Sequence, residues 1–180
     1  MHLSQQSGDI PYVYGGVTYY FNEEYLRSAF DVVLEQTSQR NISVAGILLV
    51  SPEGDAGELL KHPDFNGIAP YTMPNMTTLE SVNCYAAAFD FLAKRYCTAD
   101  NRYGRIAHWI MHNEVDGCID WTNMGVKPLT VFTDTYIKSM RICYNIVRQY
   151  DKQAEVLGSF THSWTQIANV GWWLYTSKEI

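Results

Sequence analysis

The chain has 180 residues, with 13 Lys and Arg against 19 Asp and Glu, and a formal net charge of −6. A negative net field repels phosphate, so this balance argues against nucleic acid and against an anionic membrane surface as partners. Hydrophobic residues make up 47% of the chain and charged residues 18%, which indicates a folded domain with a sizeable core. The longest apolar stretches are too short to span a bilayer, so no membrane segment is expected.

The first third of the chain predicts a helix followed by a buried strand. Asn22 can cap a helix that ends near residue 40. Apolar residues at helical spacing predict its buried stripe: Leu26, Phe30 and Val33. Residues 42–50 are β-branched and almost continuously apolar, as expected for a strand covered on both faces. One further strand is possible within residues 12–20.

A long connection rich in Pro and Gly follows, over residues 51–76, and loops of this length are often functional. Thr77 and Glu80 then form a capping-box pattern at the start of a second helix, which runs to about residue 96. Its predicted inward residues are Leu79, Val82, Ala86, Phe89 and Ala93.

Two more strands and one helix are predicted in the second half. Residues 105–112 and 155–160 have strand character, and Pro128 precedes a third helix. The inward residues of that helix are Phe132, Tyr136, Met140, Cys143 and Val147.

Alternating strands and helices predict an α/β fold with parallel strands and right-handed crossovers. Two architectures fit this order, a doubly wound sheet and an arc of a (β/α)₈ TIM barrel. The motifs GxGxxG and GxxxxGK[ST] are both lacking from the sequence, which counts against the nucleotide-binding version. In either architecture the active site lies at the carboxyl ends of the strands.

The residues at these strand ends carry a resemblance to a known group of enzymes. Residues 109–114, Trp-Ile-Met-His-Asn-Glu, resemble the Asn-Glu strand end of clan A retaining glycoside hydrolases, the cellulase-like TIM barrels. The chain is more closely similar, over nearly its whole length, to an uncharacterised bacterial family of such barrels. The further segments that carry this similarity are residues 19–22, 44–49, 89–96, 104–105, 123–125 and 162–164.

The resemblance implies a retaining hydrolase of β-linked glycans, with an oligo- or polysaccharide as substrate and no cofactor. It makes Glu114 the acid/base and Asn113 the group that hydrogen-bonds the sugar 2-hydroxyl. His162 and Trp164, at the next strand end, are expected to position the sugar or to tune Glu114. The nucleophile in this clan is a Glu at the end of strand seven, and no residue of this chain matches it.

Other side chains near the strand ends have weaker assignments. His112 is a candidate substrate contact, and Trp121 is either a sugar platform or a shield of the barrel mouth. Three residues of the long loop are minor candidates for the cleft: His62, Tyr71 and Asn75. His108 and His112 are four residues apart, but without HExxH no metal site is expected. The four cysteines show no paired spacing and are expected to be reduced, mostly buried thiols: Cys84, Cys97, Cys118 and Cys143.

Residues 1–180 are therefore expected to form a single partial barrel domain that covers about strands two or three to five. A complete barrel takes about 250 residues, so the domain is expected to be truncated at both ends. Without its nucleophile, this chain alone is expected to be inactive. The alternative is a non-catalytic half-barrel module that binds carbohydrate or self-associates through its open sheet edges.

Overall fold

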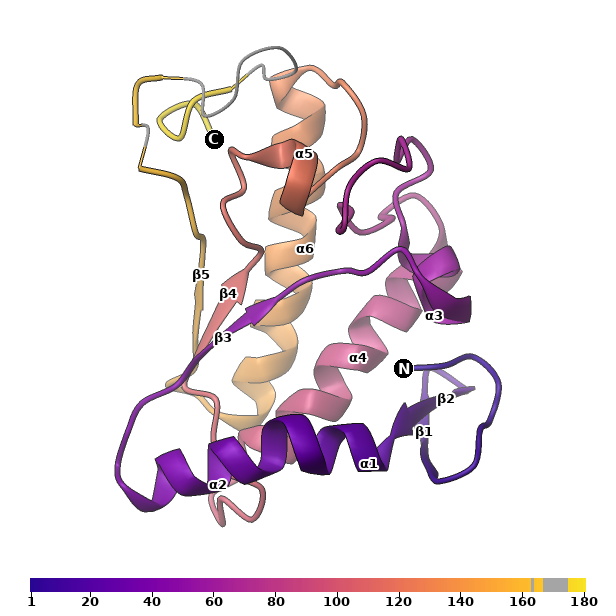
Figure 1. The fold of residues 1–180 in the computed structure, drawn as a ribbon, viewed down its shortest axis with the longest axis vertical. Coiled ribbons are helices and arrows are strands. Elements are labelled where there is room, and N and C mark those ends of the chain that lie inside the picture. The colour runs from indigo at the N-terminus through magenta and orange to yellow at the C-terminus, as the bar shows by residue number, and fades with distance from the viewer. Residues whose placement is uncertain (163, 167–174) are drawn as a thin grey trace.

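The computed structural model describes residues 1–162, 164–166 and 175–180 (Figure 1). Its elements in chain order are β1 (Asp9–Tyr14), β2 (Val17–Asn22), α1 (Glu23–Tyr25), η1 (Leu26–Asp31), α2 (Val32–Gln39), β3 (Ala45–Leu48), α3 (Gly54–Leu60), α4 (Leu79–Tyr96), β4 (His108–Met111), α5 (Cys118–Trp121), α6 (Leu129–Tyr150) and β5 (Glu155–Leu157). The α/β character and the predicted order of the longer elements are confirmed.

The N-terminal strands β1 and β2 form an antiparallel hairpin apart from the main sheet. Gly15 and Gly16 make the two-residue turn with φ of 57° and 81°, a conformation that glycine adopts without steric cost. The hairpin packs on α4, where the rings of Phe21 and Phe91 stack with centroids 3.7 Å apart. The further strand that the sequence allowed within residues 12–20 is not a single strand. These residues belong to the two hairpin strands and the turn between them, and neither strand joins the parallel sheet.

The main sheet contains three parallel strands in the order β3-β4-β5. Trp109 and Met111 of the central strand are fully buried on one face. That face meets both crossover helices, because Phe89 of α4 packs on Trp109 and Tyr136 of α6 donates a hydrogen bond to the Met111 carbonyl at 2.5 Å. Both long helices therefore lie on the same side of the sheet, behind it in Figure 1.

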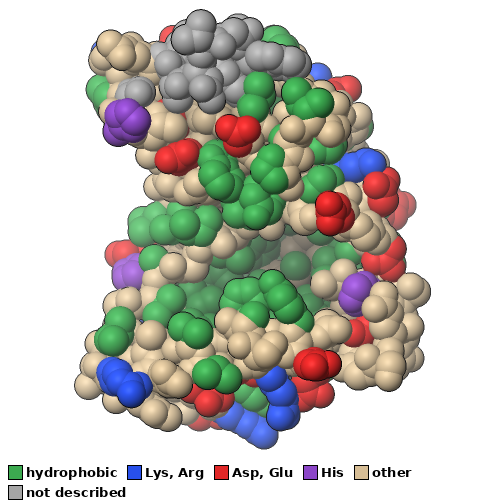
Figure 2. Space-filling model, viewed as in Figure 1, with side chains coloured by type: hydrophobic (Ala, Val, Ile, Leu, Met, Phe, Trp, Pro, Cys, Tyr) green, Lys and Arg blue, Asp and Glu red, His purple; other side chains and the backbone are tan. Residues whose placement is uncertain are grey.

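The opposite face of the sheet carries an apolar row in register, formed by Ile47, Ile110 and Leu157. Ile47 and Leu157 are 50% and 41% exposed. Figure 2 shows hydrophobic side chains gathered around a hollow in this view. The expectation that residues 42–50 form a strand covered on both faces is therefore wrong, since within the described residues helices cover only one face.

The helical stretch after Asn22 is continuous, but its buried stripe differs from the predicted one. Asn22 caps it as expected, with its side chain accepting from the Tyr25 amide. The buried residues are Leu26, Asp31 and Leu34, whereas Phe30 and Val33 are exposed. The segment η1 is a π-helix, which adds one residue to the turn and rotates the following positions.

Three local features were not predicted from the sequence. The long connection contains the short helix α3. The helix α4 begins at Leu79 with Thr78, not the predicted Thr77, as its cap, and Leu79, predicted to face inward, is 71% exposed. Gly104 lies against α2 with φ of 84°, and a Cβ atom there would be 2.1 Å from the Leu34 carbonyl carbon. The loop before β4 and the helix α2 therefore meet backbone to backbone.

Replacing Thr78 with Ala should lower the free energy of unfolding by about 1 kcal/mol. The Thr78 hydroxyl accepts a hydrogen bond from the Ser81 amide at 3.3 Å, and this amide has no other helical partner. Thr77→Ala is the matched control, because the Thr77 hydroxyl donates to Asn75 instead. Urea denaturation of both variants measures the difference, and equal losses would show that Thr78 is not the cap.

All four cysteines are free thiols, and three of them are buried; Cys118 is half-buried. Among the helices that the structure describes, none is long and apolar enough to cross a membrane.

Candidate functional site

The chain leaves β4 through Asn113 and Glu114, at the carboxyl end of the parallel sheet. Glu114 has φ of 38°, in the left-handed region. The other non-glycine residues with positive φ in the described ranges are both Asn, which tolerates this conformation better than Glu does. A strained backbone of this kind persists when the surroundings hold it, and such residues concentrate at functional sites.

The side chain of Glu114 is half-buried and held by an aromatic neighbour. The Trp121 indole nitrogen Nε1 donates a hydrogen bond to Glu114 Oε2 at 3.1 Å. Trp121, the last residue of α5, stacks on Tyr71 of the long loop, with ring centroids 5.5 Å apart and planes 15° apart. The structure therefore brings together Glu114, Trp121 and Tyr71 from three separate segments.

Ser159 joins the ends of β4 and β5. Its hydroxyl donates to Asn113 Oδ1 at 3.5 Å and accepts from the Glu114 amide at 3.4 Å, while its carbonyl accepts from the Val115 amide at 2.9 Å. Ser159 was not singled out from the sequence. The predicted strand at residues 155–160 includes Ser159, whereas β5 ends at Leu157, so the predicted bounds concealed its position just beyond the strand end.

Asp116 holds the next part of the loop. Its fully buried carboxylate accepts from the Thr161 amide at 2.8 Å, from the Thr161 hydroxyl at 2.5 Å and from the Ser177 hydroxyl at 2.6 Å. Burial alone would raise the pKa of Asp116, but the hydrogen bonds from Ser177 and Thr161 outweigh it and lower the pKa. Asp116 thus ties the loop after β4 to segments 45 and 61 residues away.

His112 lies on the helix side of the strand end and is fully buried. Its Nδ1 is 2.9 Å from the Leu48 carbonyl and its Nε2 is 3.3 Å from the Ser139 hydroxyl of α6. It also lines an apolar cavity of about 230 Å³ between β3, α3 and α4. Both ring nitrogens are in hydrogen-bond contact with protein groups, so His112 supports the strand end from behind.

Burial lowers the pKa of His112 from its ordinary value of 6.5 to about 4. The unfolded chain therefore binds a proton between these values while the folded chain does not, and stability falls as the pH drops through this window. The expected loss from pH 7 to pH 4 is of order 3 kcal/mol from this group. His112→Gln removes the group that takes up this proton. The slope of the unfolding free energy against pH across this range should therefore fall by the amount that corresponds to about one proton. His162→Gln is the control that removes an exposed imidazole; an unchanged slope in His112→Gln would contradict the assignment.

His162 and Trp164 lie at the surface, and the Trp164 side chain is 61% exposed. Within the described part of the chain, no hydrogen bond, ion pair or ring contact joins either of them to Glu114. The residue between them, Ser163, lies outside the described residues.

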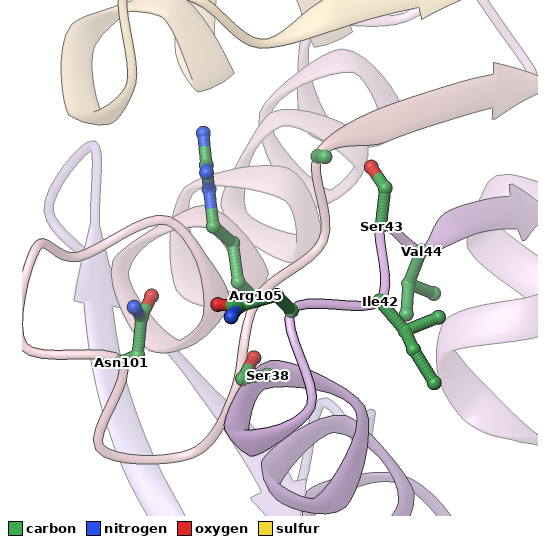
Figure 3. Close-up of a pocket in the computed structure, with 8 residues that line it drawn as sticks. Ser38, Ile42, Ser43, Val44, Asn101 and Arg105 are labelled. Atoms are coloured by element: carbon green, nitrogen blue, oxygen red, sulfur yellow. The ribbon is translucent and has the colours of Figure 1, made fainter.

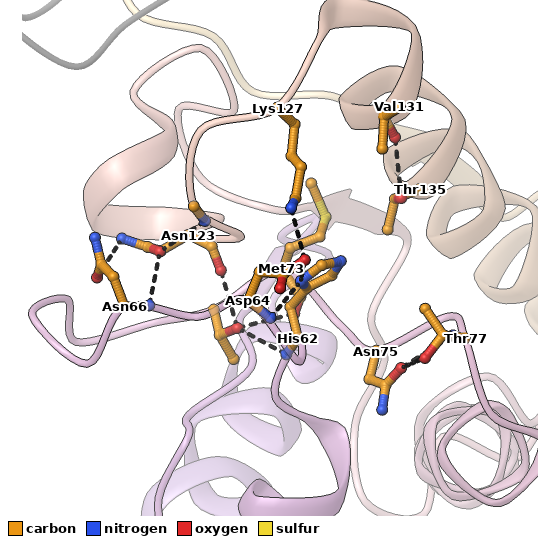
Figure 4. A network of polar contacts seen from close by, with 12 residues as sticks. His62, Asp64, Asn66, Met73, Asn75, Thr77, Asn123, Lys127, Val131 and Thr135 are labelled. Atoms are coloured by element: carbon orange, nitrogen blue, oxygen red, sulfur yellow. Dashed lines mark hydrogen bonds and ion pairs between the residues drawn. The ribbon is translucent and has the colours of Figure 1, made fainter.

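The long loop is fixed against the loop after α5 by a polar network (Figure 4). The Lys127 ammonium lies 2.6 Å from an Asp64 carboxylate oxygen, and the Asn123 side-chain amide donates to Asn66 at 3.0 Å. His62 is buried in this network, and its Nδ1 accepts from the Asp64 amide. Of the three minor candidates in the loop, Tyr71 stacks on Trp121, the partner of Glu114. Asn75 instead accepts hydrogen bonds from the Thr77 amide and hydroxyl.

A second pocket, of about 220 Å³, lies at the opposite end of the sheet (Figure 3). Its lining includes Ser43 and Val44 before β3, and Arg105 and Ala107 before β4. None of the predicted site residues lines it. It therefore stands apart from the carboxyl ends, where Glu114, Trp121 and Ser159 meet.

A family model described as "Family of unknown function (DUF5722)" matches residues 1–180. No curated protein and no solved structure matches the chain.

Proposed function

The chain belongs to DUF5722, a family of unknown function, and from its site we propose that it is an arc of a (β/α)₈ barrel from a retaining glycoside hydrolase. The substrate class is a β-linked glycan, and Glu114 is the acid/base. The observation that carries the proposal is Glu114 itself, fixed at the carboxyl end of β4 with a strained backbone and an aromatic partner.

The sheet topology fits an arc of a barrel, in which successive strands lie side by side and the crossover helices form the outer layer. Here the order β3-β4-β5 advances in one direction, and α4 and α6 pack on the same face. The row formed by Ile47, Ile110 and Leu157 lies on the face opposite the helices, which is the face that a barrel would turn to its interior.

The surroundings of Glu114 suit a sugar ligand. Trp121 offers an apolar ring beside the carboxyl group, and sugars stack their C–H faces on such rings. Asn113 Oδ1 accepts from Ser159, which leaves the Asn113 amide nitrogen to donate to a sugar hydroxyl. His162 and Trp164 remain candidates for outer contacts with a longer glycan, since both side chains are exposed.

Retaining hydrolysis uses two carboxyl groups roughly 5 to 5.5 Å apart. Glu114 gives its proton to the glycosidic oxygen while a second carboxylate, from another strand end of the barrel, bonds to the anomeric carbon and the alcohol leaves. Glu114 then takes a proton from water, whose oxygen displaces the carboxylate and releases the sugar. Every step uses side chains and water alone.

The test is azide rescue of Glu114→Ala in the full-length protein that contains this domain. On dinitrophenyl β-glycosides, whose leaving group needs no proton, azide should replace water and yield a glycosyl azide of retained configuration. Asp120→Asn is the matched control, because it removes a neighbouring carboxylate in α5 and should behave like the wild type. Inverted products, or an absence of azide product, would overturn the proposal. Binding of oligosaccharide without hydrolysis by the wild type would favour the non-catalytic module.

A further inference from the structure

The hydrogen bond between Trp121 and Glu114 distinguishes the two oxygens of the carboxyl group. The indole N–H is a donor only, and it points at Oε2 from 3.1 Å. When Glu114 is in its acid form, its carbonyl oxygen is a better acceptor than its hydroxyl oxygen, so this bond favours the form in which Oε2 is the carbonyl oxygen and Oε1 carries the proton. The indole thereby selects the oxygen from which a proton can be transferred.

The position of this indole depends on Tyr71. Trp121 ends a helix of only four residues and is half-buried, so helical packing alone does not fix its ring. The nearly parallel stack on Tyr71 covers one face of the ring. Aromatic pairs in this arrangement are favourable beyond the area that they bury.

The backbone next to Tyr71 is anchored to the segment that follows Trp121. Thr72 is fully buried, and its hydroxyl donates to the Asn123 carbonyl at 3.0 Å. The Met73 amide donates to the same carbonyl at 3.1 Å, and the Thr72 amide donates to the Val50 carbonyl at 3.0 Å. Thr72 and Asn123 thus form a short parallel bridge, which sets the two rings against each other.

We propose that Tyr71 is a positioning residue for Glu114, which acts by stacking on Trp121 so that the indole N–H occupies Oε2 and the acid proton is held at Oε1. This inference rests on the proposed function for its catalytic consequence. The contact chain itself, from Tyr71 through Trp121 to Glu114, can be tested without any substrate.

The substrate-free test follows the indole N–H resonance of Trp121 in a ¹H–¹⁵N spectrum, assigned by its loss in Trp121→Phe. Glu114→Ala removes the acceptor and should move this resonance. Tyr71→Ala should move it in the same direction, whereas the conservative variant Tyr71→Phe keeps the ring and should restore the wild-type position. A resonance that responds to Glu114→Ala but not to Tyr71→Ala would overturn the inference.

The kinetic test uses the full-length protein and two classes of glycoside. Tyr71→Ala should lower kcat roughly tenfold to a hundredfold on alkyl glycosides, and much less on dinitrophenyl glycosides. Trp121→Phe keeps the ring stack but lacks the N–H, so it should show the same selectivity even if Tyr71→Ala does not fold. The double variant should lose no more than Trp121→Phe alone.

Two results separate the possible failures. A rise in KM shared by both substrate classes, with kcat unchanged, would show that Tyr71 binds sugar directly and does not position Glu114. Full activity of Glu114→Ala on alkyl glycosides would instead overturn the proposed function, whatever the resonance of Trp121 shows.

Discussion

Glu114→Gln is expected to lower kcat roughly 10²- to 10⁴-fold on glycosides with poor leaving groups. The amide cannot supply a proton to the departing oxygen, so an alkoxide would have to leave unassisted. With a dinitrophenolate leaving group the glycosylation step needs no proton, and the loss in that step should be small. The fold should persist, because the oxygen of the new side-chain amide would still accept from the Trp121 indole, as Glu114 Oε2 does at 3.1 Å.

The measurement is a series of aryl and alkyl glycosides of increasing leaving-group basicity, assayed under single-turnover conditions in the full-length protein. The rate of Glu114→Gln should fall much more steeply along this series than that of the wild type. Asp120→Asn is the matched control and should follow the wild-type slope. An equal loss on all leaving groups would show that Glu114 has a structural role only.

A large loss of stability is expected when the buried ion pair between Asp31 and Arg95 is broken. These two residues are 4% and 8% exposed. Arg95 Nε donates to Asp31 Oδ1 at 2.9 Å, its Nη2 donates to Oδ2, and the Tyr96 hydroxyl donates to Oδ1 at 2.8 Å. The guanidinium also lies over the ring of Tyr103, 3.7 Å from its centroid. This arrangement ties η1 to α4.

Asp31→Asn leaves the Arg95 charge buried without its counterion, so the free energy of unfolding should fall by roughly 3 to 5 kcal/mol. Glu23→Gln is the control, because the Glu23 pair with Arg27 is exposed and of the same charge type, and it should cost less than about 1 kcal/mol. Chemical denaturation of both variants measures the contrast. Similar losses of unfolding free energy in Asp31→Asn and Glu23→Gln would show that the Asp31–Arg95 pair stabilises the fold no more than the exposed pair does.

The regular parts of the fold could be predicted because their burial follows one simple period. In α6 four of the five predicted inward residues, Phe132, Tyr136, Cys143 and Val147, are buried, and Met140 is half-buried. The first helix shows where this reasoning fails. The π-helix η1 shifts the buried position to Asp31, five residues after Leu26, and no periodicity of 3.6 can anticipate a buried acid there.

The helix α3 could not be predicted because two of its seven residues are glycines, which disfavour helices. Gly57 is required there by close packing, since a Cβ would lie 2.7 Å from the Pro52 carbonyl carbon. At the site, the strand-end pattern placed Glu114, Asn113 and Trp121 near one another. The partnership of Trp121 with Tyr71 joins positions fifty residues apart, which no local pattern can reveal.

The contact between Gly104 and α2 limits which substitutions the chain can accept at position 104. Any codon change that replaces Gly104 adds a Cβ within 2.1 Å of the Leu34 carbonyl carbon, so the helix backbone would have to retreat. Leu34 is three residues beyond Asp31, and that retreat would pull Asp31 from Arg95. Genetic suppressors of a substitution at position 104 should therefore map to the path of η1 and α2, far along the chain from the loop that carries the original change.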